Sequence, residues 1–223
     1  MEPRLSRAEY WLLETVVEAR VPLHWLGGDG DFIMVLNKVS HGLDRAGIAA
    51  ALDQMFAAGW LYAHWGRSEL SFRPKRSEIE QALAARDATL DGWLYYGLSA
   101  LGGDTWEAFA RPRWERFVDE IFFDSEDDPH ETAVLFAADR AQLERRFRWI
   151  CEQGCHPHSD HRVLPDTARW ETLRPWQATY WKQLPIGYRL EYRFGPQSDE
   201  SAARPAWDCC CRLPRWYDWG DTR

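Results

Sequence analysis

Residues 40–85 carry the pattern that most restricts how this chain can fold. Asp44 stands where a helix N-cap belongs, and Gly59 stands where the chain leaves that helix and needs a residue that tolerates the left-handed conformation. Between them, apolar side chains recur at helical spacing. They are Ile48, Ala51, Leu52, Met55 and Phe56. The pattern predicts a helix over 44–58 with one buried face.

Shorter elements are predicted on both sides of this helix. Residues 60–66 and 69–74 indicate two strands around a turn at Gly66, and residues 77–85 return to helical spacing. Near the N-terminus, Ser6 and Glu9 have the spacing of a capping box. They therefore predict an earlier helix that ends before Val21-Pro22.

This order of helices followed by a strand, a turn and a strand resembles the winged-helix domains of PadR-like and MarR-like regulators. Residues 96–102, Tyr-Gly-Leu-Ser-Ala-Leu-Gly, match a segment that often closes the wing in those families. The tetrapeptide Gly-Trp-Leu-Tyr occurs at 59–62 and again at 92–95, so either copy could supply the last strand of the wing. The resemblance implies a winged-helix domain over 1–113 and, in those families, DNA binding.

The expected reading helix is poorly suited to contacting bases, which are read mainly by Arg, Lys, Asn and Gln. Its polar side chains are Asp44, Arg45, Asp53 and Gln54. The expected wing is more basic, with Arg67, Arg73, Lys75 and Arg76. The chain carries a net charge of −8, and neither half is net basic. DNA binding is therefore expected to be weak and dominated by phosphate contacts from the wing.

The remainder, 114–223, has a different character. Residues 116–123, 131–139 and 188–194 are typical of strands, and residues 140–154 form a strongly patterned helix. The expected fold class of the whole chain is α+β, with a winged helix followed by a small α+β domain that has an antiparallel sheet. An irregular tail is expected to dock through its aromatic residues, because exposed aromatics are costly. These are Trp207, Trp216, Tyr217 and Trp219.

The densest set of metal-binding side chain types lies in one short segment. It comprises Cys151, Cys155, His156, His158 and His161, with Asp160 among them. Zinc requires about four nitrogen or sulfur ligands. The spacing differs from the separated pairs of structural zinc sites, so no metal and no cofactor are expected. A polar loop with a small buried Cys151 is the alternative favoured here.

Residues 119–131 are strongly acidic. Their carboxylates are Asp119, Glu120, Asp124, Glu126, Asp127, Asp128 and Glu131. The segment lacks the glycine on which a calcium loop turns, so a solvated turn is expected. If the segment is functional, attraction of a basic partner or mimicry of nucleic acid is favoured over metal binding.

No catalytic motif stands out: the sequence contains no G-x-S-x-G, P-loop or H-E-x-x-H pattern. With no membrane-length apolar run and an odd number of cysteines, 5, the chain is expected to be cytoplasmic. Its acidic composition and 14 tryptophans resemble those of immunity proteins that neutralise bacterial toxins. The expected function is non-catalytic protein binding, and the alternative is a winged-helix transcriptional regulator with a C-terminal sensing or dimerisation domain.

Aromatic side chains and acids of the C-terminal half are the expected partner-binding residues, because aromatic residues supply much of the energy of interfaces. They are Trp170, Trp176, Tyr180 and Trp181, together with Asp124, Asp127 and Asp128. A helix over 170–180 would place its aromatics on one face. The same face could instead be the core of the second domain.

Overall fold

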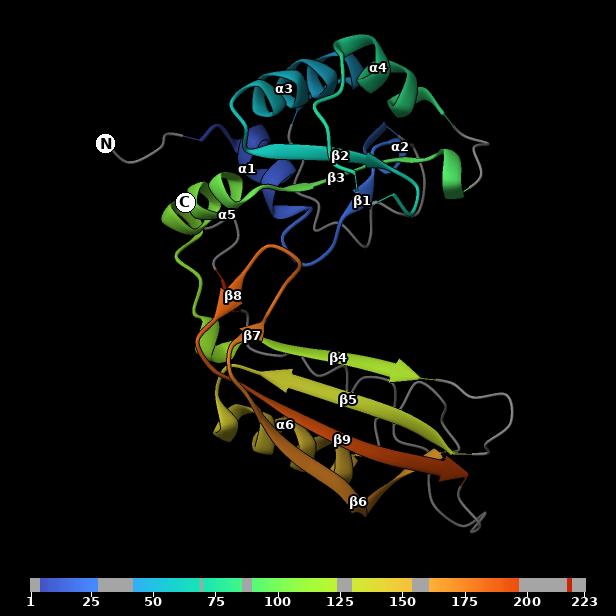
Figure 1. Ribbon diagram of the computed structural model, residues 1–223, viewed down its shortest axis with the longest axis vertical. Coiled ribbons are helices and arrows are strands. Elements are labelled where there is room, and N and C mark those ends of the chain that lie inside the picture. The colour runs from blue at the N-terminus through green and yellow to red at the C-terminus, as the bar shows by residue number, and fades with distance from the viewer. Residues whose placement is uncertain are drawn as a thin grey trace. The chain divides into compact units, whose positions relative to one another are not determined.

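The chain has the expected α+β class, with helices and antiparallel sheets. The computed structural model describes residues 5–27, 42–68, 70–85, 90–123, 130–153, 161–196 and 216–217. These residues divide into two compact units (Figure 1). Unit 1 contains the described residues up to Pro112 together with Thr179–Lys182, and unit 2 contains Arg113–Ala178 and the described residues from Gln183 to Tyr217.

Unit 1 is a small three-stranded sheet with several helices. Its helices are α1 (Arg7–Glu14), α2 (His24–Gly27), α3 (Arg45–Ala57), α4 (Arg76–Ala84), the 3-10 turn η2 (Leu90–Gly92) and α5 (Ala100–Ala110). Its strands are β1 (Val21–Pro22), β2 (Leu61–Trp65) and β3 (Leu94–Leu98), hydrogen-bonded in the order β1-β3-β2. All pairs are antiparallel.

Local signals place the helix ends in unit 1. The Ser6 side chain accepts a hydrogen bond from the backbone N–H of Glu9, and the Glu9 carboxylate accepts one from the backbone N–H of Ser6, so the predicted capping box is confirmed. Asp44 accepts from the N–H of Gly47 at 2.7 Å, which confirms the predicted cap of α3. Gly59 follows α3 at a φ of 73°, as expected for a residue at a helix C-terminus.

The second strand paired with β2 is not the one expected from residues 69–74. β3 pairs with the whole of β2, from Leu61↔Leu98 to Trp65↔Leu94. Of the described residues in the expected strand, Phe72 alone forms a bridge, to Ala63. The strand prediction for this segment is therefore wrong, and the second copy of the repeated tetrapeptide leads into the strand that completes the sheet.

Residues Thr179–Lys182, from the later part of the chain, belong to unit 1 and form an anchor there. The hydroxyl of Tyr180 donates to the carbonyl of Val16 at 2.5 Å and accepts from the N–H of Leu98 at 2.6 Å. Burial raises the pKa of Tyr180, so the hydroxyl keeps the proton that it donates. Trp181 donates from Nε1 to the carbonyl of Val17 at 2.8 Å. The segment thus satisfies backbone groups just after α1 and at the end of β3.

Lys182 and a glycine of α5 complete this anchor. Lys182 Nζ lies 2.7 Å from Glu107 Oε2, and both side chains are partly buried. The indole of Trp181 meets Trp106 edge to face at 6.1 Å between ring centroids. Gly103 makes room for the same indole, because a Cβ at this position would overlap the ring.

Unit 2 is a four-stranded sheet with one long helix. It begins with the 3-10 turn η3 (Trp114–Arg116), and its helix is α6 (Arg140–Gln153). The main strands are β4 (Val118–Phe123), β5 (Glu131–Ala137), β6 (His161–Leu173) and β9 (Gly187–Pro196), in the antiparallel order β4-β5-β9-β6. A separate two-stranded ribbon pairs β7 (Trp176–Gln177) with β8 (Gln183–Leu184).

Residues 170–180 do not form the helix that would have placed their aromatics on one face. Trp170 lies in β6 and Trp176 in β7, with Pro175 between them, and a proline is poorly tolerated inside a helix. The aromatics that a helix would have placed on one face are therefore divided between a sheet edge, a buried position and the anchor in unit 1.

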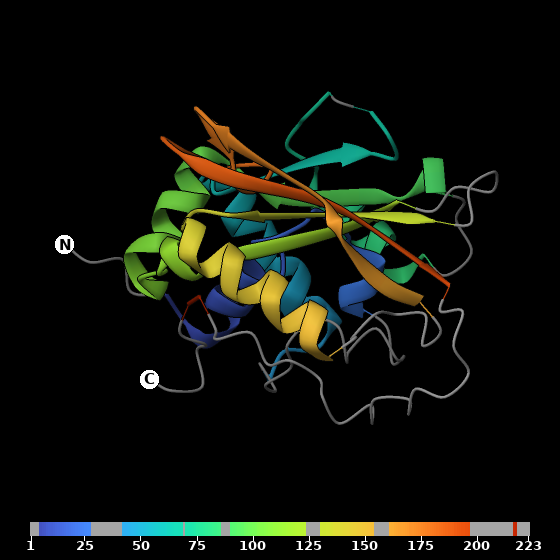
Figure 2. The same cartoon turned by 90° about the horizontal axis from the view of Figure 1, so that it is seen from below.

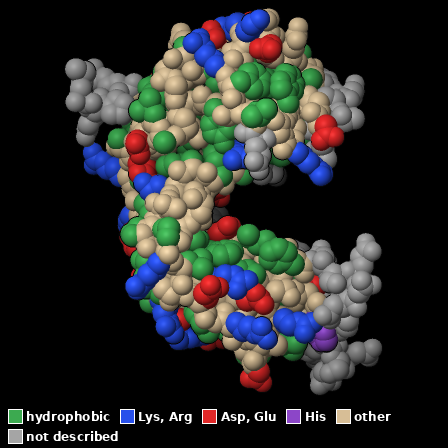
Figure 3. All heavy atoms as spheres, in the orientation of Figure 1, with side chains coloured by type: hydrophobic (Ala, Val, Ile, Leu, Met, Phe, Trp, Pro, Cys, Tyr) green, Lys and Arg blue, Asp and Glu red, His purple; other side chains and the backbone are tan. Residues whose placement is uncertain are grey.

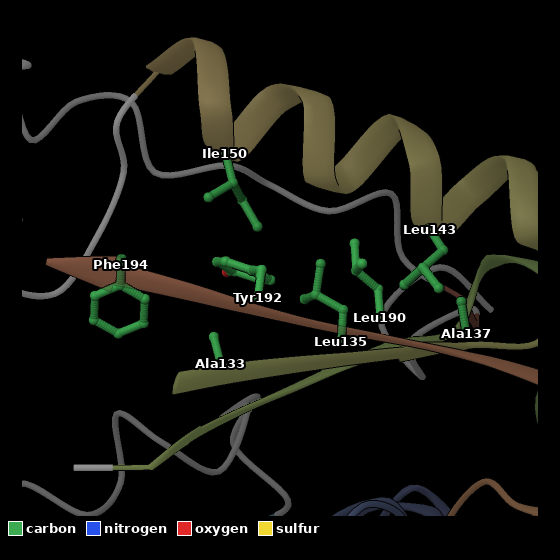
Figure 4. Close-up of a cluster of buried hydrophobic side chains, with 8 residues drawn as sticks. All are labelled: Ala133, Leu135, Ala137, Leu143, Ile150, Leu190, Tyr192 and Phe194. Atoms are coloured by element: carbon green, nitrogen blue, oxygen red, sulfur yellow. The ribbon is translucent and has the colours of Figure 1, made fainter. Parts of the chain in front are cut away.

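One face of the unit 2 sheet packs against α6 and forms the core of the unit (Figures 2 and 4). Alternate residues of β5 and β9 point toward the helix, as the period of two in a strand requires. The buried cluster is Ala133, Leu135, Ala137, Leu143, Ile150, Leu190, Tyr192 and Phe194. From the described part of the tail, Trp216 packs against Trp114 and Phe117 and is 8% exposed.

The anchor predicts a specific effect of substitution at Gly103. Gly103→Ala should lower the free energy of unfolding by about 1–3 kcal/mol, because the new methyl group displaces the Trp181 indole. Asp104→Ala places the same residue type at an exposed position of α5 and should change stability by about 0.5 kcal/mol or less. Thermal denaturation followed by circular dichroism compares the two variants. Equal melting temperatures would contradict the described fit between α5 and Trp181.

Candidate protein-binding surface

β4 exposes an unusual run of large apolar side chains at one edge of the unit 2 sheet. Ile121, Phe122 and Phe123 are 40%, 38% and 53% exposed. β4 stands at the end of the strand order and, among the described residues, pairs with β5 alone. In Figure 3, hydrophobic side chains gather over β4, whereas charged side chains dominate over β9 and β6. Consecutive exposed apolar residues on a strand edge are typical of an interaction surface.

Contacts with the core hold this edge in place. The carboxylate of Glu120 lies 2.7 Å from the Arg146 guanidinium of α6, and both side chains are largely buried. The hydroxyl of Tyr192 on β9 donates to the same carboxylate at 3.1 Å. Burial, followed by the charge of Glu120, raises the pKa of Tyr192, so its hydroxyl remains a donor. The Phe122 ring also meets the Phe194 ring at 6.2 Å.

The surroundings of the edge are acidic in sequence. The chain contains no Lys or Arg between Phe117 and Asp139, while seven carboxylates fall within 119–131. Asp119, Glu120 and Glu131 lie on β4 and β5. The expected partner-binding acids Asp124, Asp127 and Asp128 lie outside the described residues.

The expected aromatic residues of the partner surface do not form one patch. Trp170 is 40% exposed on β6, where it meets Phe147 at 6.3 Å and carries the Arg140 guanidinium over its ring at 5.6 Å. Trp176 is 4% exposed and packs against Phe117, as the core interpretation requires. Tyr180 and Trp181 belong to the anchor in unit 1.

Two of the four expected wing cations have acidic neighbours within unit 1. Arg73 lies 4.0 Å from Asp53 of α3. Arg76 pairs with Glu80 at 2.8 Å and also donates to the carbonyl of Ala46. Arg67 and Lys75 are exposed. Since Asp53 lies on the expected reading helix, it offsets part of the positive charge that a phosphate backbone would meet.

The possible metal ligands fall mostly outside the described residues. Of the five candidate donors, Cys151 is placed near the end of α6, and burial raises the pKa of its thiol. His161 begins β6, and Cys155, His156 and His158 are not described. Within the described ranges, no group of three or more His, Cys, Asp or Glu side chains is arranged to hold a metal ion.

Sequence reasoning found β4 but did not assign it a binding role. Residues 116–123 were predicted to form a strand, whereas Ile121, Phe122 and Phe123 were not among the expected interface residues. The available signal was three consecutive large apolar residues at a strand end, immediately before Asp124. In a strand, such a run places apolar side chains on both faces.

Comparisons with known proteins found no match to this chain among family models, curated proteins or solved structures. Among the described helices, none is both long enough and apolar enough to cross a membrane.

The ion pair beneath β4 predicts unequal effects of two glutamate substitutions in unit 2. Glu120→Ala should destabilise the protein by about 3 kcal/mol, because the guanidinium of Arg146 loses the carboxylate that balances its charge in a largely buried position. Glu144→Ala removes an exposed partner of Arg140 four residues away on α6 and should cost about 0.5 kcal/mol. Urea unfolding measures both changes. Equal destabilisation would contradict the assigned anchoring role of Glu120.

Proposed function

We propose that this chain is a non-catalytic protein-binding protein that captures a basic partner on the β4 edge of unit 2. The exposed run Ile121–Phe123 carries the proposal, because three large apolar side chains lie together on a strand with one described neighbour. Aromatic side chains commonly dominate binding energy.

Electrostatics supports a basic partner. The overall charge of −8 and the acids of residues 119–131 attract positively charged proteins and speed their encounter with this surface. Neutralisation of a basic toxin in the bacterial cytoplasm is the specific role that we propose. The acidic, tryptophan-rich composition of the chain supports this role.

Capture of a partner should depend on β4. Immobilised wild-type protein is expected to retain a basic protein from a lysate of cells that produce the partner, and Phe123→Ser should reduce retention by about tenfold or more. Leu101→Ser is the matched control, since Leu101 is 54% exposed in unit 1. Quantitative mass spectrometry of the retained proteins measures the difference.

Two outcomes of the capture experiment would contradict the proposal. One is equal retention by wild type, Phe123→Ser and Leu101→Ser. The other is loss of retention with Leu101→Ser alone. The melting temperatures of both variants show whether each remains folded.

A winged-helix regulator is the second candidate. The strand order β1-β3-β2, with α3 directly before β2, supports this alternative. The sparse polar surface of α3 and the contact between Arg73 and Asp53 favour weak binding through phosphates over base reading.

DNA binding, if present, is expected to be weak and salt-sensitive. Mobility shifts with mixed-sequence DNA should disappear as salt rises toward physiological levels, because counterion release dominates such binding. Replacing Arg67 and Lys75 together by Ala should weaken the shift for all sequences alike. Tight, sequence-selective retention at physiological salt would instead favour the regulator.

A further inference from the structure

We infer that the partner binds as an extended basic strand that pairs with the outer edge of β4 and enlarges the sheet of unit 2. The inference rests on the proposed function and adds the conformation and charge of the bound segment. An edge strand presents unpaired N–H and C=O groups, and peptides use such edges in strand addition.

The opposite edge of the same sheet has features that block strand addition. β6 contains Pro165, which has no N–H to donate. Its pairing with β9 shifts register between Leu164 and Arg169, and such irregularity disrupts the regular ladder that an added strand needs. Arg169 adds an exposed charge. Natural sheets use these three devices to protect their edges.

β4 lacks the proline and the register shift, and its exposed charge is acidic, Asp119. Its pairing with β5 runs without a break from Val118↔Ala137 to Phe123↔Thr132. Its 6 residues, VDEIFF, include no proline, lysine or arginine. One sheet therefore has an irregular edge at β6 and a regular edge at β4, and the regular edge carries the exposed apolar run.

The β4 edge is also held ready to bind. Glu120 pairs with Arg146 and accepts from Tyr192, while Phe122 packs against Phe194. These contacts fix β4 from the side of the sheet that α6 covers. A strand that is already ordered loses little conformational entropy on binding, so more of the pairing energy contributes to affinity.

Charge favours a basic segment over a second copy of this chain. Asp119 lies on β4, and Asp124 and Glu126 follow Phe123 in the sequence without an intervening cation. A segment with lysine or arginine near its ends would neutralise these acids. A second β4 would instead bring the same carboxylates to the edge, and like charges opposed across strands are destabilising.

The alternation of side chains along β4 indicates which residue types the partner segment should carry. Ile121 and Phe123 lie on one face of the sheet and Phe122 on the other. An added strand would have its side chains beside them on both faces. The fitting partner segment is therefore apolar or β-branched in its centre and basic at its ends.

Backbone methylation of a model peptide tests strand pairing directly. The probe is a labelled peptide in which valine and threonine alternate, with two lysines at each end. It is titrated into the full chain by fluorescence anisotropy. Two further peptides carry N-methyl groups on every second residue. One is methylated on its odd-numbered residues and the other on its even-numbered residues. A fourth peptide replaces the lysines by glutamates.

Strand addition predicts a distinctive result. One of the two methylated peptides should bind about tenfold or more weakly than the parent peptide, and the other should bind like the parent. The reason is that an added strand directs only alternate N–H groups to its neighbour. The glutamate peptide should not bind. Phe123→Lys and Ile121→Lys should each weaken binding of the parent peptide. Thr172→Lys on β6 is the control and should leave binding unchanged.

Three outcomes would overturn the inference. Equal binding of the two methylated peptides would show that side chains alone make the contact. Binding of the glutamate peptide as tight as that of the lysine peptide would remove the charge argument. A sedimentation-detected dimer that is lost in Phe123→Lys, without peptide binding, would identify a second copy as the occupant. The proposed function is judged separately by retention of the natural partner, which the first two outcomes leave intact.

Discussion

The ion pair between Glu120 and Arg146 is the contact on which the candidate surface depends. β4 has one described strand neighbour, so the sheet alone holds it from one side. Glu120 attaches the strand to α6, and Tyr192 donates a further hydrogen bond to the same carboxylate. Because charges are expensive to bury, these three groups are stable only as a set. Their arrangement holds β4 against α6 while Ile121 and Phe123 are exposed at the edge.

The two edges of the unit 2 sheet differ in a way that composition does not reveal. β6 combines Pro165 with a register shift, whereas β4 is regular and ends in the exposed apolar run Ile121–Phe123. An unprotected edge is an aggregation hazard unless a partner uses it or charge discourages self-pairing. We propose that the acids on and after β4 discourage pairing of identical chains and favour a basic partner.

Prediction from the sequence succeeded where the decisive contacts are local. The caps of α1 and α3 involve groups within a few residues of one another, so Ser6, Glu9 and Asp44 were sufficient to place both starts. The sequence did not decide which segment pairs with β2, because strand pairing depends on residues that are far apart in the chain. Residues 170–180 do not form a helix, and Pro175 is the local signal against one. The aromatic residues of this segment have helical spacing, but in the structure they lie at a sheet edge, in a buried position and in the anchor in unit 1.

The candidate site was predictable only in part. The sequence indicated a strand over 116–123 and an acidic stretch beyond it, but not which strand would end at an edge. That position follows from the order β4-β5-β9-β6, which depends on long-range pairing. Trp181 likewise resembled an interface residue, because no local signal showed that Gly103 leaves space for its indole in unit 1.

Hydrogen–deuterium exchange of the full chain, alone and with its captured partner, tests the central claim most directly. Binding at the β4 edge predicts slower exchange of backbone amides within 117–123, with β6 unchanged as an internal reference. Slower exchange confined to α3 and residues 66–76 would contradict the account and identify unit 1 as the binding surface.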